Sequence, residues 1–192
     1  MISTIKKHLQ DSIAVKEKIL SDGSLLAAVE KVVNAIVTAY KQEKKVILLG
    51  NGGSAADAQH IAGEFVGRFY KERKALPALA LHTNSSIVTA LANDYGYDAV
   101  FARQVDAYAV AGDVVIGIST SGNSPNVITA IQKAKDKGAV TVGLTGGKAS
   151  KLCDVADICL RVPSPDTPRI QEAHITLGHI ICFLVEETLF PS

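Results

Sequence analysis

A run of hydroxyl side chains in the middle of the chain has the composition of an anion-binding loop. The apolar stretch 114–118 precedes it, and Pro125 opens a segment with helical periodicity. The hydroxyl residues between them are Ser119, Thr120, Ser121 and Ser124. We expect a buried strand, a loop and a helix with Ser124 as its N-cap, where free N–H groups, the helix dipole and the hydroxyls converge on a phosphate. An ordinary strand-to-helix connection with a good cap is the alternative.

A glycine-rich stretch near residue 50 predicts a second loop that opens a helix. The apolar residues 46–49 lead into Gly50, Asn51, Gly52, Gly53 and Ser54. Ser54 and Asp57 have the spacing of a capping box for a helix from about 55 to 68. The glycines lack the spacing of the dinucleotide fingerprint, and no Walker lysine follows them. Taken alone, this stretch is a weak signal, because any tight turn could use it.

Two predicted helices carry the side chains that suit acid–base chemistry. His60 and Glu64 are spaced i,i+4 and therefore share one helix face. Gln171 and His179 lie on the predicted final helix. A carboxylate and an imidazole can move protons near neutral pH when their surroundings tune them. The alternatives are a solvated Glu64 on an outer face and a His179 that is a satisfied core histidine.

The spacing along the final helix limits where its polar residues can act. Gln171 and His179 are two turns apart, roughly 12 Å along a helix axis. One metal ion or one small substrate would not reach both side chains within a single chain. If both act at one site, we expect a neighbouring subunit to supply one of them.

Hydrophobic periodicity predicts alternating strands and helices after two N-terminal helices. Strands are expected at 46–49, 78–81, 114–118, 140–144 and 158–162. Helices are expected at 5–20, 25–40, 55–68, 85–92, from about 99, 125–137 and 169–189, with a break at 93–98. This alternation implies an α/β fold: a parallel five-stranded sheet covered by helices on both faces, in a flavodoxin- or Rossmann-like three-layer sandwich. We expect one domain over 1–192, with a helical hairpin at 1–43 for oligomerisation and an α/β core at 44–192.

The composition excludes several classes of partner. The 192 residues include 20 basic and 19 acidic side chains that are interspersed, so nothing indicates binding to nucleic acid or to an anionic membrane. The first residues are too polar for a secretory segment and no apolar run has membrane-spanning length, so a cytoplasmic location is expected. Cys153, Cys159 and Cys182 lack metal-finger spacing and are expected to be reduced core residues.

Taken together, these motifs resemble the sugar isomerase (SIS) domain family over essentially the whole chain. The resemblance rests on residues 50–54, His60 with Glu64, Asn93-Asp94, 117–124, and 169–172 with His179. Within that family the chain is most similar to the phosphoheptose isomerases. These enzymes interconvert sedoheptulose 7-phosphate and D-glycero-D-manno-heptose 7-phosphate, a precursor of the nucleotide-activated heptose of lipopolysaccharide or capsule. The resemblance therefore implies an aldose–ketose isomerase that works through an enediol.

The resemblance also implies roles for individual residues. The substrate phosphate would be held by Ser119, Thr120, Ser121 and Ser124. The same pocket would be lined by Asn51, Gly52, Gly53 and Ser54, and sugar hydroxyls would meet Asn93 and Asp94. Glu64 would be the general base and His179 the partner acid or base. Some family members bind zinc at the positions of His60, Glu64, Gln171 and His179, and the family is tetrameric with sites between subunits.

Two alternative functions are compatible with the sequence. The DnaA initiator-associating protein represents a related branch, and residues 188–191 resemble its C-terminal end. That resemblance implies a non-catalytic protein that binds DnaA and regulates replication initiation. It also implies the loss of the residues that match Glu64 and His179, yet this chain has both. Because a phosphate loop does not measure sugar length, an isomerase of another sugar phosphate, such as arabinose 5-phosphate, is the third hypothesis.

Overall fold

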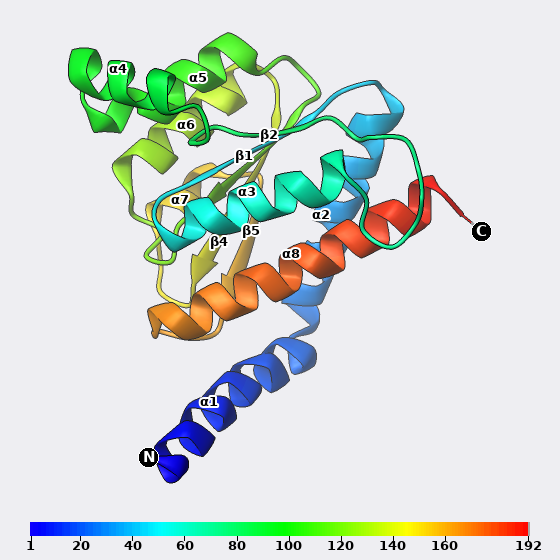
Figure 1. Cartoon of the computed structure of the whole chain (residues 1–192), viewed down its shortest axis with the longest axis vertical. Helices are drawn as coiled ribbons and strands as arrows, with labels where there is room; N and C mark the ends of the chain where they lie inside the picture. Colours follow the sequence, from blue (N-terminus) through cyan, green and yellow to red (C-terminus); the bar gives the residue numbers. More distant parts are fainter. Residues whose placement is uncertain (192) are drawn as a thin grey trace.

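The computed structural model describes residues 1–191 and contains a five-stranded parallel sheet (Figure 1). The strands are β1 Val46–Gly50, β2 Ala78–Ala80, β3 Val114–Ile118, β4 Val140–Gly146 and β5 Ile158–Val162. They lie in the order β2-β1-β3-β4-β5, and each adjacent pair is parallel. The predicted sheet is therefore confirmed, in the flavodoxin-like order. In this order the winding reverses between β1 and β3, which is where such sheets bind their ligands.

Helices cover both faces of the sheet. They are α1 Ile2–Ser21, α2 Gly23–Lys41, α3 Gly53–Val66, α4 Ser85–Tyr95, α5 Val100–Tyr108, α6 Pro125–Asp136, α7 Lys151–Val155 and α8 Thr167–Leu189, with a 3-10 turn at Tyr97–Ala99. One apolar core lies under α2, α3 and α8, and the other lies under α4, α5, α6 and α7. Ile116 of β3 belongs to the first core and its neighbour Val115 to the second, because successive strand side chains point to opposite faces. The predicted three-layer arrangement is confirmed.

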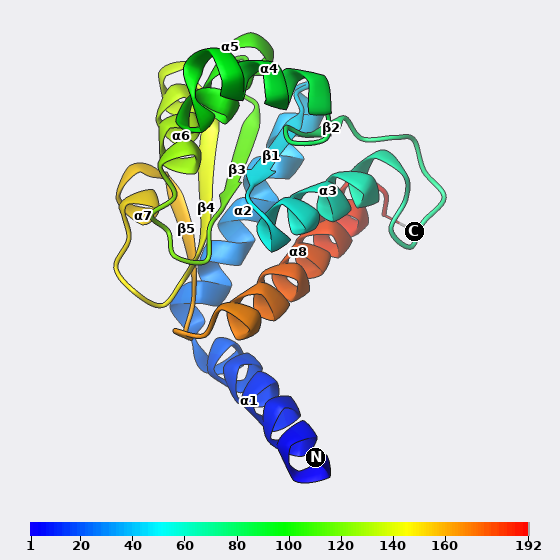
Figure 2. The same cartoon turned by 60° about the vertical axis from the view of Figure 1, so that its left-hand side comes forward.

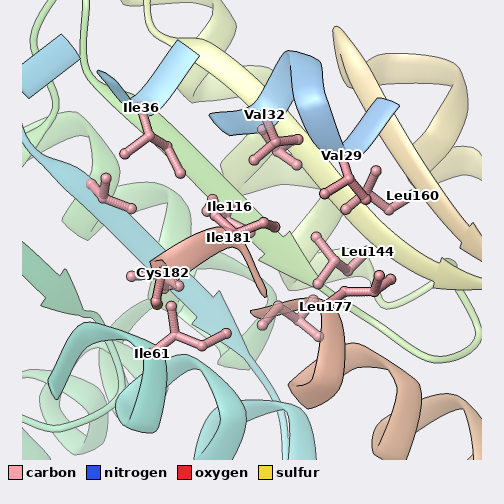
Figure 3. Packing of buried hydrophobic residues seen from close by; sticks show 14 of the residues in the cluster. Val29, Val32, Ile36, Ile61, Ile116, Leu144, Leu160, Leu177, Ile181 and Cys182 are labelled. Carbon is pink, nitrogen blue, oxygen red and sulfur yellow. The ribbon is translucent and has the colours of Figure 1, made fainter. Parts of the chain in front are cut away.

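The first core fixes α3 against α8, the two helices that carry the candidate acid–base residues. Figures 1 and 2 show these helices side by side on one face of the sheet. Figure 3 shows Ile61 of α3 and Leu177 and Ile181 of α8 converging with side chains of α2 and the strands. A Cβ atom at the buried Gly178 would lie 2.6 Å from Ile61 Cδ1. The missing side chain at residue 178 therefore permits the close approach of α8 to α3.

The first helix leads away from the body of the domain. Figures 1 and 2 show α2 lying along the sheet and α1 extending beyond it. Asp22 is the residue between the two helices. The Asp22 carboxylate accepts hydrogen bonds from the N–H groups of Ser24 and Leu25 and so caps α2. Large apolar side chains are exposed along α1: Ile2, Ile5, Leu9, Ile13 and Leu20. Both predicted N-terminal helices are present, but α1 does not fold back along α2, so the hairpin is open within one chain.

Two predicted helix ends were wrong. Gly52, with a φ of 56°, is the N-cap of α3, so Ser54 lies buried inside the first turn and the predicted Ser54–Asp57 capping box does not form. A left-handed conformation suits glycine, which begins the helix earlier than the hydroxyl pattern indicates. The predicted break at residue 93 is also wrong, because α4 runs to Tyr95 and ends at Gly96, where φ is 80°.

The expectation of three reduced cysteines is wrong for two of them. Cys153 and Cys159 form a disulfide, whereas Cys182 is free and buried in the first core. Cys153 lies on α7, a five-residue helix that hydrophobic periodicity did not predict. This helix turns the chain back toward β5, where Cys159 lies. The pairing depends on that turn, and residue spacing alone carries no sign of it.

One helix of the described residues, α2, is long and apolar enough to cross a membrane by length and composition. Its residues Val32 and Ile36 are fully buried in the first core, together with Val29 and Val33. This burial is what a core helix of an α/β domain requires.

Candidate active site

The hydroxyl loop after β3 has the form of an anion cradle. Ser124 is the N-cap of α6, as predicted, but its hydroxyl lies 3.0 Å from Ser119 Oγ and makes no side-chain bond to the helix. Ser119 Oγ also lies 3.3 Å from Ser121 Oγ and accepts from the N–H of Gly122 at 3.1 Å. The hydroxyls are thus gathered at the start of α6, where an anion is stabilised by the helix dipole.

A cavity of about 380 Å³ opens beside this loop, at the carboxyl ends of β3, β4 and β5. Thr120, Ser121, Ser164 and Thr167 line it with hydroxyls. Lys148 contributes the positive charge of the lining. Lys148 is not predictable from the sequence, because it follows β4 and meets the hydroxyl loop only when the sheet forms. A cation beside hydroxyls suits a phosphate dianion.

The glycine-rich loop after β1 is tied to the same helix end. Asn51 and Asn126, which lies in the first turn of α6, exchange two amide hydrogen bonds of 2.9 and 3.0 Å. The Tyr97 hydroxyl donates to Asn51 Oδ1 at 3.2 Å. The structure therefore joins residues 51–54 to the start of α6. Asn126 and Tyr97 were not singled out in the sequence, since neither lies in a glycine or hydroxyl motif.

A cluster of two imidazoles and a carboxylate lies farther along α3 and α8. His60 Nε2 is 3.2 Å from Glu64 Oε1 and 2.9 Å from His179 Nε2. His60 is exposed, whereas Glu64 and His179 are half-buried. A hollow of about 450 Å³ lined by His60 and Glu64 opens beside the cluster. The predicted base and its predicted partner therefore meet within one chain, with access to solvent.

The cluster fits a divalent metal ion. One ligand atom from each of His60, Glu64 and His179 lies within 4.8 Å of the others. Two imidazoles and one carboxylate are the donors of many catalytic zinc sites, which keep a further coordination position open. Gln171, the fourth predicted ligand, lies two turns back along α8, where its amide would collide with a Cβ at Gly53. The structure brings three of the four predicted ligands together and leaves Gln171 beside the glycine-rich loop.

The predicted sugar-contacting pair lies near the end of α4. Asn93 and Asp94 are exposed on α4, and Asn93 Nδ2 donates to Asp94 Oδ1 at 2.8 Å. Among residues 1–191, no hydrogen bond connects this pair to residues 51–54 or 119–124. The contact of Asn93 and Asp94 with sugar hydroxyls stays a prediction.

Asp57 is a further polar group between the two loops and the cluster. It lies one turn before His60 on α3, and its Oδ2 is buried without a hydrogen-bond partner in the described part of the chain. Burial raises the pKa of the Asp57 carboxyl to about 6, although the nearby His60 opposes the shift. The sequence predicts Asp57 only as the partner of Ser54 in a capping box. Its burial without a hydrogen-bond partner is visible only in the structure.

Comparisons with known proteins identify the family of this chain. A family model described as SIS domain matches residues 9–146. The chain is 56% identical over 188 residues to a phosphoheptose isomerase of Aneurinibacillus thermoaerophilus, which covers 98% of this chain and 95% of that protein. It is 54% identical to phosphoheptose isomerase 2 of Campylobacter jejuni, with 98% and 94% covered.

Solved structures show the same likeness. A phosphoheptose isomerase from Francisella tularensis superposes with a TM-score of 0.92 at 33% identity, over 97% of this chain and 98% of that one. The enzyme from Neisseria gonorrhoeae gives a TM-score of 0.90 at 39% identity, over 96% and 98%. The chain therefore belongs to the SIS domain family, in the branch of the phosphoheptose isomerases.

Proposed function

We propose that the protein interconverts sedoheptulose 7-phosphate and D-glycero-D-manno-heptose 7-phosphate. The observation that carries this proposal is the meeting of Glu64, His60 and His179 on α3 and α8, the first of which begins at the phosphate cradle. Membership of the phosphoheptose isomerases supports the choice of sugar. The product is a heptose phosphate suited to activation as a nucleotide sugar for lipopolysaccharide or capsule.

The phosphate and the reacting carbons would occupy different parts of the site. Ser119, Thr120, Ser121 and Ser124 would hold the phosphate, with Asn51, Gly52, Gly53 and Ser54 beside them. Binding of the phosphate in the cradle would hold carbons 1 and 2, at the other end of the sugar, next to the cluster. Asn93, Asp94 and Gln171 would contact sugar hydroxyls once their subunits assemble.

The chemistry would proceed by proton transfer. The Glu64 carboxylate takes a proton from C1 of the ketose, and the electron pair forms the C1–C2 double bond of an enediol as the carbonyl oxygen O2 accepts a proton from His179. The return of the proton from Glu64 to C2, with loss of the O1 proton to the imidazole, gives the aldose. His60, 2.9 Å from His179 and 3.2 Å from Glu64, fixes the orientation of both groups.

We also propose zinc as a cofactor, held by His60, Glu64 and His179, with Gln171 of a neighbouring chain as the fourth ligand. When bound, the ion would polarise the carbonyl oxygen of the sugar in place of the His179 proton, because an imidazole nitrogen that ligates zinc cannot also carry that proton.

The apolar face of α1 supports a homotetramer. Ile5, Leu9 and Ile13 are each more than half exposed, at 53%, 61% and 55%, on a helix that leaves the body of the domain. A neighbouring chain would cover this face and bring its polar residues to the site. We place the assembled enzyme in the cytoplasm, with sugar phosphates as its substrates and without nucleic-acid or membrane partners.

Conversion of sedoheptulose 7-phosphate by the wild type, Glu64→Gln and His179→Ala tests the proposal. Each variant is expected to lose activity by roughly 100- to 10,000-fold, the usual share of a general acid or base. Arabinose 5-phosphate serves as the competing substrate, and capture of DnaA tests the non-catalytic alternative. Comparable turnover in the three proteins would remove the assigned roles.

A further inference from the structure

A buried ion pair lies behind the acid–base cluster and joins the helices that carry it. Arg73 Nε donates to Glu186 Oε1 at 2.9 Å, and the two side chains are 2% and 1% exposed. Arg73 lies in the segment after α3, whereas Glu186 lies on α8, about two turns after His179. A buried ion pair often adds no stability over well-packed apolar residues, because both charges lose their hydration. Net stability is therefore a weak explanation for this pair.

Arg73 closes the C-terminal end of α3. Its Nη2 donates to the carbonyl oxygen of Glu64 at 2.8 Å. Its Nη1 donates to the carbonyl oxygens of Phe65 and Gly67 at 2.8 and 3.0 Å. Carbonyl groups in the last turn of a helix lack intrahelical partners, so these bonds define where the turn lies. The guanidinium thus fixes the backbone from which the Glu64 side chain projects.

Glu186 acts on the other half of the cluster. Its carboxylate accepts from the backbone N–H groups of Phe69, Tyr70 and Lys71 at 3.0, 2.7 and 2.9 Å. The Phe69 ring lies against the His179 imidazole, with 5.7 Å between ring centroids. Burial raises the pKa of the Glu186 carboxyl, but the three N–H donors and Arg73 outweigh burial and lower it to about 2. The carboxylate is therefore charged at neutral pH and holds Phe69 beside His179.

We propose that Arg73 and Glu186 are positioning residues that set the placement of Glu64 relative to His179. Arg73 is hydrogen-bonded to the backbone of Glu64. Glu186 is hydrogen-bonded to the backbone of Phe69, whose ring lies against the His179 imidazole. Neither residue touches the substrate. The kinetic part of this inference rests on the proposed function, whereas its structural part does not.

Glu186→Gln, compared with Glu187→Gln, tests the kinetic part. Glu187 is the matched control, because it pairs with Lys71 on the surface and its side chain is 40% exposed. For Glu186→Gln we expect kcat to fall by about 10- to 100-fold, the usual effect of a residue that orients a catalytic group, while KM changes by less than about two-fold. Competitive inhibition by inorganic phosphate should be unchanged, because the cradle lies at the starts of α6 and α3, whereas the ion pair holds the opposite end of α3. Glu187→Gln should match the wild type.

Arg73→Met combined with Glu186→Leu separates positioning from stability. Replacing both charges by apolar side chains leaves no unpaired buried charge, although the backbone groups that the two side chains bind lose those partners. Urea unfolding establishes that the double variant is folded before the ring contact is measured. In metal-free protein, the nuclear Overhauser contact between the His60 and His179 rings reports the cluster without any need for activity. We expect that contact to weaken in the double variant and to persist in Glu187→Gln.

Two results would overturn the inference. One is a folded double variant with the wild-type ring contact and wild-type kcat. The other is a Glu186→Gln variant in which kcat, KM and inhibition by phosphate all worsen to a similar extent, which would indicate a general loss of structure. If the wild type lacks isomerase activity, the proposed function fails, and the ring contact alone decides whether the ion pair positions the cluster.

Discussion

Single residues determine how the charges of this site behave. Asp57 and Glu186 are both removed from solvent at one oxygen or more, yet the pKa of their carboxyls moves in opposite directions. Asp57 Oδ2 has no hydrogen-bond partner among the described residues, whereas Glu186 accepts from three N–H groups and Arg73. Partners, and not depth alone, decide whether a carboxylate keeps its charge.

Asp57→Asn should stabilise the protein at neutral pH. The pKa of Asp57 is about 6 in the folded protein and near 3.8 when unfolded. The folded state therefore binds the proton more tightly, and the wild type loses stability as pH rises from about 4 through 6. We expect the free energy of unfolding in urea to be higher for Asp57→Asn than for the wild type at pH 7.5. The difference should vanish below pH 4, and an equal difference at both pH values would contradict the assignment.

Lys148→Met should weaken binding of the phosphate without slowing the chemical step. Lys148 is the cation in the lining of the cavity beside the hydroxyl loop. Loss of a charge-assisted contact is expected to raise KM about 10-fold, with kcat within about two-fold of the wild type. Lys151→Met, which changes an exposed lysine on α7, is the control. A kcat effect as large as the KM effect would show that Lys148 serves another role.

Helices and loops position these residues, and the local sequence predicts some of these elements better than others. The loop after β3 was predictable, because a buried strand, hydroxyls and a proline at the start of a helix are neighbours in the chain. The start of α3 was not, since Gly52 takes the N-cap conformation ahead of the more conspicuous Ser54. α7 was not predicted, because five residues are too few to show a helical period. Contacts of Lys148, Asn126 and Arg73 arise only when distant segments pack.

Gly178→Val should separate α8 from α3. A Cβ at this position lies 2.6 Å from Ile61 Cδ1, so the new side chain overpacks the core. We expect a loss of about 1–3 kcal/mol in unfolding free energy, together with a fall in isomerase activity as Glu64 and His179 move apart. In a double-mutant cycle with Ile61→Ala, the two effects should couple by at least about 0.5 kcal/mol. Simple additivity would show that the two side chains do not collide.

At the scale of the whole molecule, one chain does not bring all four predicted metal ligands together. It gathers three predicted metal ligands, but the fourth, Gln171, lies beside Gly53 of the glycine-rich loop. The sequence pointed to this outcome through the two-turn separation of Gln171 and His179 on one helix. The direction of α1 was not predictable, because an amphipathic pattern identifies a helix without showing which chain covers its apolar face.

Changing Leu9→Glu and Ile13→Glu together should dissociate the assembly. Both side chains are exposed on α1, at 61% and 55%, so the substitutions do not disturb the core of a single chain. Light scattering after size-exclusion chromatography is expected to give a tetramer for the wild type and smaller species for the variant, with activity lost in parallel. Lys6→Glu with Lys16→Glu, on the exposed polar positions of α1, is the control. An active monomeric variant would show that one chain is sufficient.

The central claim is that Glu64 moves a proton between the first two carbons of a sugar phosphate bound at residues 119–124. The most direct measurement is nuclear magnetic resonance of the product formed from sedoheptulose 7-phosphate in deuterium oxide. We expect the wild type to place deuterium at C2 of the aldose and to exchange it into C1 of recovered ketose, and Glu64→Gln to do neither. No conversion by the wild type, or equal deuterium incorporation by Glu64→Gln, would contradict the account.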